Sequence, residues 1–210
     1  MRSKIVKILV VIIGLTFLGG ILQLSLYSRS ENESLRIRQL HYDLYNSKIG
    51  SHSEDVSVIV DFSIPSSASR MFVYDRRIAG GYQISSSKCA HGAGGGSTIS
   101  KPVFSNVAGS ECSSLGSYRL VRNDKMTNTG FPCIRLEGLD ASNSNAASRG
   151  IVIHEGPVLA DDISLGFPIP VTRYISQGCF TISSHTFHCL QQLVENGSTI
   201  YLYAIYEDGK

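Results

Sequence analysis

Charged residues are scarce in this 210-residue chain: Asp, Glu, Lys and Arg make up 17% of it, against 42% for the hydrophobic types. A disordered chain has the opposite balance, because it lacks the apolar side chains that a core requires. The formal net charge is only +2, and Arg2, Lys4 and Lys7 contribute to it at the N-terminus. The rest of the chain has no basic block of the kind that binds phosphate backbones, so no nucleic-acid partner is expected.

Cysteine is absent before Cys89, so no thiol near the N-terminus is available for a lipid anchor. The N-terminus instead carries an uncharged apolar run at residues 8–27, which is long enough to cross a hydrocarbon core of about 30 Å. Cations precede this run and only Arg29 follows it closely, which predicts that everything after it lies outside the cytoplasm. Residues 24–27 offer no small-residue cleavage site, so we expect a retained membrane anchor, with a cleaved signal peptide as the alternative.

The chain length leaves room for one globular domain behind an anchor or signal segment at residues 1–28. Residues 29–54 are predicted to form a tether with a short amphipathic helix, because apolar residues between 35 and 45 recur at three- and four-residue steps. Residues 55–210 are then expected to form the folded domain.

Strand-forming residues dominate the predicted domain. Alternating patterns or short apolar runs predict strands at residues 56–62, 70–74, 81–85, 134–139, 151–154 and 199–206. A helix is predicted at residues 184–195, with Ser184 as its N-cap and Asn196-Gly197 as its stop. The expected fold class is mainly β with a few short helices.

Stretches rich in Gly, Ser and Asn are expected to be loops, at residues 92–97, 105–114 and 141–148. The first of them, GAGGGS, follows a predicted strand, as a phosphate-binding loop does. It lacks the Lys-Ser/Thr pair that ends such a loop and it opens no helix. A plain flexible loop is therefore the preferred interpretation.

Two short segments together predict a nucleophile and its base. The hydrophobic strand at residues 150–156 contains His154, and the segment Ser-Gln-Gly-Cys at residues 176–179 ends in Cys179. A thiol becomes an acyl-transfer nucleophile only as the thiolate, and a nearby imidazole that takes its proton is the usual means. Cys179 is thus predicted to be a nucleophile and His154 its general base. The residues alone leave open a buried thiol and a hydrogen-bonded polar group.

Gly178 completes the predicted catalytic group. A glycine beside the cysteine removes a side chain from the place where a carbonyl carbon must approach the sulfur. The amides of Gly178 and Cys179 are expected to donate to the oxyanion that forms during attack.

The chain has an odd number of cysteines: Cys89, Cys112, Cys133, Cys179 and Cys189. In an oxidising compartment this leaves at least one thiol unpaired, and the other four allow three pairings. A Cys112–Cys133 disulfide is the first expectation. Zinc is suggested by the residue types His185, His188 and Cys189, but their spacing does not complete a tetrahedral site, so no metal is expected.

Five segments together resemble the murein L,D-transpeptidase catalytic-domain family in order and content. They are residues 87–92 (SKCAHG), 104–118, 135–139 (RLEGL), 145–156 and 176–179 (SQGC). The resemblance spans roughly residues 56–206, and its specific part is the Ser-x-Gly-Cys element with a histidine on an upstream strand. It implies the β-rich fold of that family, with Cys179 as nucleophile and His154 as general base.

The sequence departs from the broader pattern of that group at three places. Gln177 stands where a histidine is common, and Thr181 stands where Asn or Arg often follows the cysteine. The stretch between His154 and Ser176 is also longer than usual. These differences concern contacts with substrate, because neither Gln177 nor Thr181 is needed to form a thiolate.

Six further residues are expected on the substrate side: His91, Ser113, Ser114, Arg149, Ser176 and Gln177. Each of the first four also has a structural interpretation. His91 contacts a peptide or anchors a loop, and Arg149 binds a substrate carboxylate or a loop carboxylate such as Glu137. Ser113 and Ser114 bind a peptide backbone or satisfy turn amides.

The resemblance implies a peptidoglycan L,D-transpeptidase that needs no cofactor. Its Cys179 thiolate would attack the carbonyl between the L-centre of a diamino acid and the terminal D-alanine of a stem peptide. D-Alanine would leave, and an amine of a neighbouring stem would resolve the thioester into a cross-link. The expected location is the periplasmic or cell-envelope side of a bacterium, with residues 8–27 in the membrane.

Two alternatives remain open at the level of sequence. Water in place of the amine would make the chain an L,D-carboxypeptidase that trims stem peptides. A cysteine held in a disulfide would make it a non-catalytic module that only binds the cell wall.

Overall fold

The computed structural model describes residues 54–66, 68–78, 81–98, 101–127, 130–156 and 176–207, together with Gln23 and Asp43. The chain divides into two compact units, Met1–His52 and Ser53–Lys210. The predicted membrane segment at residues 8–27 and the tether helix lie outside the described residues, apart from Gln23 and Asp43. Within the described residues, the structure contains no helix with the length and apolar character of a membrane span.

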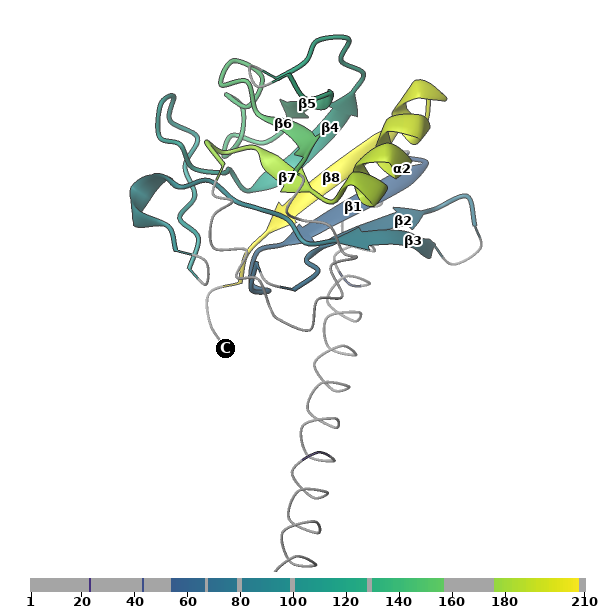
Figure 1. Cartoon of the computed structure of the whole chain (residues 1–210), viewed down its shortest axis with the longest axis horizontal. Helices are drawn as coiled ribbons and strands as arrows, with labels where there is room; N and C mark the ends of the chain where they lie inside the picture. Colours follow the sequence, from purple (N-terminus) through teal and green to yellow (C-terminus); the bar gives the residue numbers. More distant parts are fainter. Residues whose placement is uncertain are drawn as a thin grey trace, which may run out of the picture. The chain divides into compact units, whose positions relative to one another are not determined.

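Eight strands form one sheet in the order β3-β2-β1-β8-β4-β5-β6-β7 (Figure 1). The pairs β1–β8 and β6–β7 are parallel, and the other neighbours are antiparallel. The strands are β1 (Val56–Asp61), β2 (Met71–Asp75), β3 (Tyr82–Ser87), β4 (Gly116–Val121), β5 (Cys133–Gly138), β6 (Val152–Glu155), β7 (Phe180–Ile182) and β8 (Ile200–Ile205). The described part also contains the helix α2 (Ser184–Glu195) and the single 3₁₀ turn η1 (Gly94–Gly96).

The mainly β prediction is confirmed, and every predicted strand overlaps an observed one. Two strands were not predicted. β4 was missed because Ser117 and the exposed Arg119 interrupt its apolar pattern. β7 was missed because it has only three residues, too few for a pattern.

The central strand β1 is buried along its whole length. Its parallel pairing with β8 and antiparallel pairing with β2 place it in the interior of the sheet (Figure 1). A strand covered on both faces reads as a continuous apolar run rather than as an alternation, which is what Val58, Ile59 and Val60 provide. The hydrophobic core therefore forms around this strand.

The two edges of the sheet meet, so that the sheet is nearly closed. The chain after β3 runs along β7, where Cys89 bridges Ile182 and the Ala90 amide donates to the Thr181 carbonyl at 2.9 Å. A second bridge joins Gly92 to Ser176. Pairing removes the free edges that would otherwise expose backbone polar groups. The residues just before β7 consequently lie where the two edges come together.

Helix α2 packs against β3 and β6 and matches the predicted range. Its buried face consists of Thr186, Phe187 and Leu190. The predicted end is confirmed, since Asn196 is the C-cap and Gly197 follows with a φ of +79°. The predicted cap at the start is wrong by one residue: Ser184 is the first helical residue and Ser183 is the N-cap.

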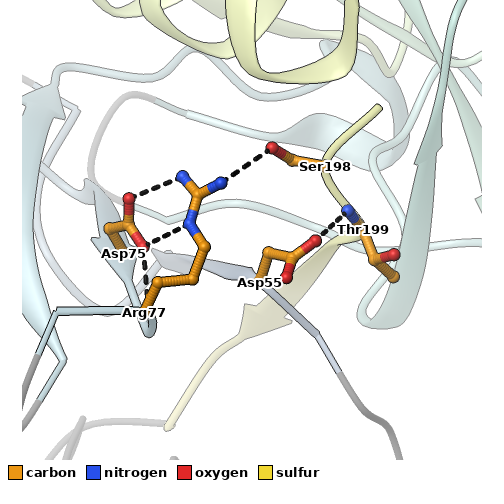
Figure 2. A network of polar contacts seen from close by, with 5 residues as sticks. All are labelled: Asp55, Asp75, Arg77, Ser198 and Thr199. Carbon is orange, nitrogen blue, oxygen red and sulfur yellow. Dashed lines mark hydrogen bonds and ion pairs between the residues drawn. The ribbon is translucent and has the colours of Figure 1, made fainter. Parts of the chain in front are cut away.

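A polar network ties the chain around the start of β1 to the connection between α2 and β8 (Figure 2). The Arg77 guanidinium donates to the Asp75 carboxylate at 2.7 and 2.9 Å and to Ser198 Oγ at 3.4 Å. The Thr199 amide donates to the Asp55 carboxylate at 2.8 Å. Arg77 is half exposed, so its ion pair adds little stability, and the network mainly orients the segments that enter β1 and β8.

The expected Cys112–Cys133 disulfide is wrong, because all five cysteines are free thiols. Each of the two thiols contacts polar groups of the chain segment that precedes it. Cys112 Sγ lies 3.3 Å from the Ser110 carbonyl, whereas Cys133 Sγ accepts from Asn123 Nδ2 at 3.0 Å and lies 3.3 Å from the Lys125 carbonyl.

Candidate active site

Cys179 lies at the end of a tight turn that leads directly into β7. Its side chain is partly exposed, and its Sγ lies 3.8 Å from the Gly150 carbonyl. Of the other cysteines, Cys89, Cys112 and Cys133 are buried. The Cys179 thiol is therefore partly accessible to solvent, and it lies where the two edges of the sheet meet.

Gly178 has two structural reasons to be glycine. Its φ of +109° is in the region that side chains rarely adopt. A Cβ at this position would lie 2.7 Å from the Cys112 carbonyl oxygen and 2.8 Å from Ile151 Cδ1. The turn thus packs directly on the segment around Cys112, and no side chain fits between them.

His154 lies in the middle of a row of side chains across three strands. Its register partners are Cys133 on β5 and Thr181 on β7, and the Phe131 ring stacks on its imidazole at 6.3 Å between centroids. Nδ1 lies 2.9 Å from the Glu155 carbonyl oxygen, and Nε2 lies 3.2 Å from Thr181 Oγ1. A carbonyl only accepts, so Nδ1 carries the proton, and the unprotonated Nε2 accepts from the Thr181 hydroxyl.

Cys179 and His154 come from neighbouring strands. Phe180, which follows Cys179, pairs with Ile153, which precedes His154. Within the described residues no hydrogen bond joins the thiol to the imidazole: Sγ lies 3.8 Å from the Gly150 carbonyl, and Nε2 is in contact with Thr181 Oγ1. Catalytic contacts are often long before substrate binds, so this arrangement fits a nucleophile and base that meet in the reaction.

Burial raises the pKa of the Cys179 thiol, and the neighbouring Cys133 raises it further. The Val152 amide and the positive charge of Arg149 act in the opposite direction, but their effect is smaller. At neutral pH the resting side chain is therefore the thiol rather than the thiolate. A thiol in this state needs a general base in order to act as a nucleophile.

Ser176 organises the turn from within. Its hydroxyl accepts from the Gly178 amide at 3.1 Å and donates to the Cys179 carbonyl at 2.6 Å, while Gln177 is exposed. This corrects the expectation that both amides of the turn would serve an oxyanion. The Gly178 amide is used by Ser176, because the turn folds back on its own first residue, and only the Cys179 amide remains.

Ser113 and Ser114 are both buried, in the loop that packs on the turn. The Ser113 hydroxyl accepts from the Gly92 amide at 3.0 Å and donates to the Gly178 carbonyl at 3.1 Å. The Ser114 hydroxyl donates to the Ser105 carbonyl at 2.9 Å. These contacts match the structural interpretation of the two serines, as partners of backbone groups in turns.

Arg149 holds the same loop through a guanidinium with four polar contacts. Its partners are the Ser105 and Cys112 carbonyls, at 2.9 and 2.5 Å, and the Ser114 and Ser110 hydroxyls, at 2.8 and 3.3 Å. The suggested pairing with Glu137 is wrong. Glu137 lies on β5 beside the cations of Arg119 and Arg135, which are its partners.

His91 is only 3% exposed and is held on both sides. Arg70, which only donates, points NH2 at Nδ1 at 2.8 Å, so the proton lies on Nε2 and is donated to the Thr98 carbonyl at 2.9 Å. Burial and the Arg70 charge lower the pKa of His91 to about 4. These contacts favour the loop-anchoring interpretation of His91, which leaves its expected peptide contact as a proposal.

Arg70 was missed at the level of sequence. It is fully buried, donates to the Cys89 and Ile64 carbonyls at 2.7 and 3.2 Å, and lies 4.9 Å from the centre of the Phe62 ring. A cation at the start of a strand is usually exposed, so no sequence signal marks it. Phe131 was missed for a similar reason, because its stacking on His154 depends on the pairing of β5 with β6.

The described residues contain no cluster of three metal-ligating side chains. A family model of the L,D-transpeptidase catalytic domain matches residues 30–203. The chain belongs to this family. Its enzymes are cysteine-dependent. No curated protein matches the chain.

Solved structures with a similar fold are distant in sequence. The helical cell shape determining protein Pgp2 from Campylobacter jejuni is 13% identical, with a TM-score of 0.50 over 80% of this chain and 56% of that chain. An L,D-transpeptidase from Mycobacterium smegmatis is 13% identical, with a TM-score of 0.41 over 73% of this chain and 59% of that chain. This chain spans little more than half of either. The likeness to Pgp2 supports the fold alone.

Proposed function

We propose that this chain is a peptidoglycan L,D-transpeptidase with Cys179 as its nucleophile and His154 as its general base. Membership of the L,D-transpeptidase family supports a function on peptidoglycan. The observation that carries the assignment to these residues is the turn at residues 176–179. It presents a partly exposed thiol beside a strand whose histidine has an unprotonated Nε2.

In the first half-reaction His154 Nε2 takes the Cys179 proton as Sγ attacks the carbonyl carbon before the terminal D-alanine. The new C–S bond leaves negative charge on the carbonyl oxygen, and the Cys179 amide is the donor placed to stabilise it. When the C–N bond breaks, the protonated His154 gives its proton to the leaving amine. D-Alanine departs and a thioester remains.

In the second half-reaction an amine of a neighbouring stem attacks the thioester, and His154 accepts its proton. The C–N bond of the cross-link forms while the C–S bond breaks, and the thiol of Cys179 is restored. No cofactor takes part in this proposal. The proposed substrate-side residues are His91, Ser113, Ser114, Arg149, Ser176 and Gln177, of which Gln177 is the exposed member of the turn.

The proposal places the enzyme in the bacterial envelope. Residues 1–28 would act as a membrane anchor or signal segment, with residues 8–27 in the membrane and residues 29–54 as a tether. Residues 55–210 would form the catalytic domain on the periplasmic side. The uncharged run and the cations before it are the support for this placement.

The test uses the full-length chain in mild detergent with a purified tetrapeptide muropeptide, and mass spectrometry of the products. A cross-linked dimer with released D-alanine supports transpeptidation, and a tripeptide monomer would instead indicate the carboxypeptidase. Cys179→Ala should abolish both products, and His154→Ala should reduce them at least about 100-fold. An unchanged muropeptide would indicate a module that only binds, although the disulfide that this alternative requires is absent from Cys179.

A further inference from the structure

Ser113 joins two backbone groups that are distant in sequence and meet only in the fold. Its side chain is 0% exposed, and its hydroxyl accepts from the Gly92 amide and donates to the Gly178 carbonyl. Gly92 packs directly on the segment before Ser113, since a Cβ on Gly92 would lie 2.2 Å from the Glu111 carbonyl oxygen. The hydroxyl of Ser113 is therefore committed to these two backbone groups.

The backbone groups of Gly178 and Cys179 can be accounted for one by one. The Gly178 amide donates to Ser176, the Cys179 carbonyl accepts from Ser176, and the Gly178 carbonyl accepts from Ser113. Of the backbone groups of Gly178 and Cys179, the Cys179 amide is the one that remains, and it has no acceptor among the described residues. A backbone amide beside a thiol and without an acceptor in the described part of the chain is suited to receive a developing negative charge.

The direction of that amide follows from the Ser113 hydrogen bond. In a trans peptide the carbonyl of Gly178 and the amide of Cys179 point to opposite sides of the chain. Because Ser113 holds the carbonyl on the buried side, the amide is turned away from the interior. Gly178 has a positive φ and the freedom of glycine, so its own backbone does not prevent this peptide from rotating.

We propose that Ser113 is a positioning residue for the oxyanion donor: it fixes the Gly178–Cys179 peptide so that the Cys179 amide faces the reacting carbonyl. This role rests on the proposed function and deepens it. Without the hydroxyl, the peptide is free to rotate and bring the Gly178 carbonyl, a negative dipole, toward the developing oxyanion. The effect belongs to acyl transfer and not to the nucleophilicity of the sulfur.

This distinction provides the test, because alkylation of a thiol by iodoacetamide forms no oxyanion. Both reactions of Cys179 are measured in the full-length chain, with Cys189→Ser as background to remove the other partly exposed thiol. Acylation is followed with the tetrapeptide muropeptide as release of D-alanine. Ser113→Ala should lower kcat for that release about 100-fold with little change in KM, while the alkylation rate stays within about twofold.

Ser87→Ala is the matched control. Ser87 is also 0% exposed, and its hydroxyl also bridges two backbone groups, accepting from the Ser183 amide at 2.9 Å and donating to the Lys88 carbonyl at 2.6 Å. It touches no polar group of the turn at residues 176–179. Its replacement should therefore change acylation and alkylation together or change neither.

Each outcome decides the matter. The positioning role would be overturned if Ser113→Ala acylated at the wild-type rate. It would also be overturned if that variant lost acylation and alkylation in equal measure. If Ser113→Ala does not fold, Ser113→Cys retains a weaker donor and should show a smaller but selective loss of acylation; wild-type acylation in that variant would contradict the proposal. A wild-type chain that releases no D-alanine would overturn the proposed function itself, and this role with it.

Discussion

At the scale of single residues, hydrogen bonds decide which ring nitrogen of each histidine at the site carries the proton. Nδ1 of His154 is protonated because its partner is a carbonyl, and the unprotonated Nε2 accepts from the Thr181 hydroxyl. His91 has the opposite tautomer, because Arg70 donates to its Nδ1. Two histidines of one chain thus have different tautomers, and their hydrogen-bond partners decide which ring nitrogen carries the proton.

The rate at which Cys179 reacts with iodoacetamide should keep rising at pH values above the ordinary pKa of a cysteine, because burial raises the pKa of its thiol. It should still be the first of the five thiols to react. Its neighbours Val152 and Arg149 favour the thiolate, whereas at Cys189 burial and then the charge of Asp75 both raise the pKa of the thiol. Peptide mapping after brief labelling between pH 7 and pH 10 measures this. Preferential labelling of Cys189, or a rate that levels off near pH 7, would contradict the prediction.

At the scale of elements, the turn at residues 176–179 acts as one unit with the loop at residues 105–114. Gly178 packs on the Cys112 carbonyl, and Arg149 holds the loop from the other side. The turn is also where the chain after β3 meets β7, through the bridge between Gly92 and Ser176. Cys179 is therefore placed by three segments that are separated in sequence.

Gly178→Ala should destabilise the fold by about 2–4 kcal/mol. The alanine would have to adopt a strained positive φ, and its Cβ would clash with the Cys112 carbonyl oxygen, a backbone atom that does not move easily. Chemical denaturation measures the free energy of unfolding. Gly197→Ala is the control, since it has a similar positive φ of +79° but no atom within 4 Å of the added Cβ. It should cost about 1 kcal/mol. Equal losses in the two variants would show that the contact with Cys112 contributes nothing.

At the scale of the folded unit, closure of the sheet buries groups that are usually exposed. Arg70 and His91 lie inside, and their mutual hydrogen bond is satisfied only while His91 is neutral. The pKa of His91 is lowered to about 4, whereas an unfolded histidine titrates near 6.5. As pH falls through this interval the unfolded chain binds a proton that the folded chain does not. The contribution of His91 to stability is therefore present above about pH 6.5 and is lost toward pH 4.

The stability difference between the wild type and His91→Gln should consequently shrink as the pH is lowered from 7 to 4, by up to about 3 kcal/mol. Glutamine does not titrate, so the comparison removes the effect of the carboxylates that the two chains share. Urea unfolding at several pH values gives the two curves. Curves that run parallel over this interval would refute the assignment of the pH dependence to His91.

Much of the fold could be predicted from local pattern. Helix α2 is amphipathic and ends at Asn-Gly, and β1 is a continuous apolar run, so both are marked by their own residues. β4 and β7 were missed because their burial comes from neighbours: β4 lies between β8 and β5, and β7 pairs with β6 and with the chain around Cys89. For the site, Cys179 and His154 were predicted from residue type and motif, and their assigned roles remain proposals.

By itself, the sequence determined the mainly β class, the position of its helix and the resemblance that the family match then confirmed. The tertiary structure decided which hydrogen-bonding groups of the site are free and which are occupied. Ser113, Arg149 and His91 are of types that suit substrate binding, and only the fold shows their partners to be backbone carbonyls, amides and a buried guanidinium. The reason is physical: a side chain's chemistry is local, but its hydrogen-bond partners are set by chain segments that meet only when the sheet closes.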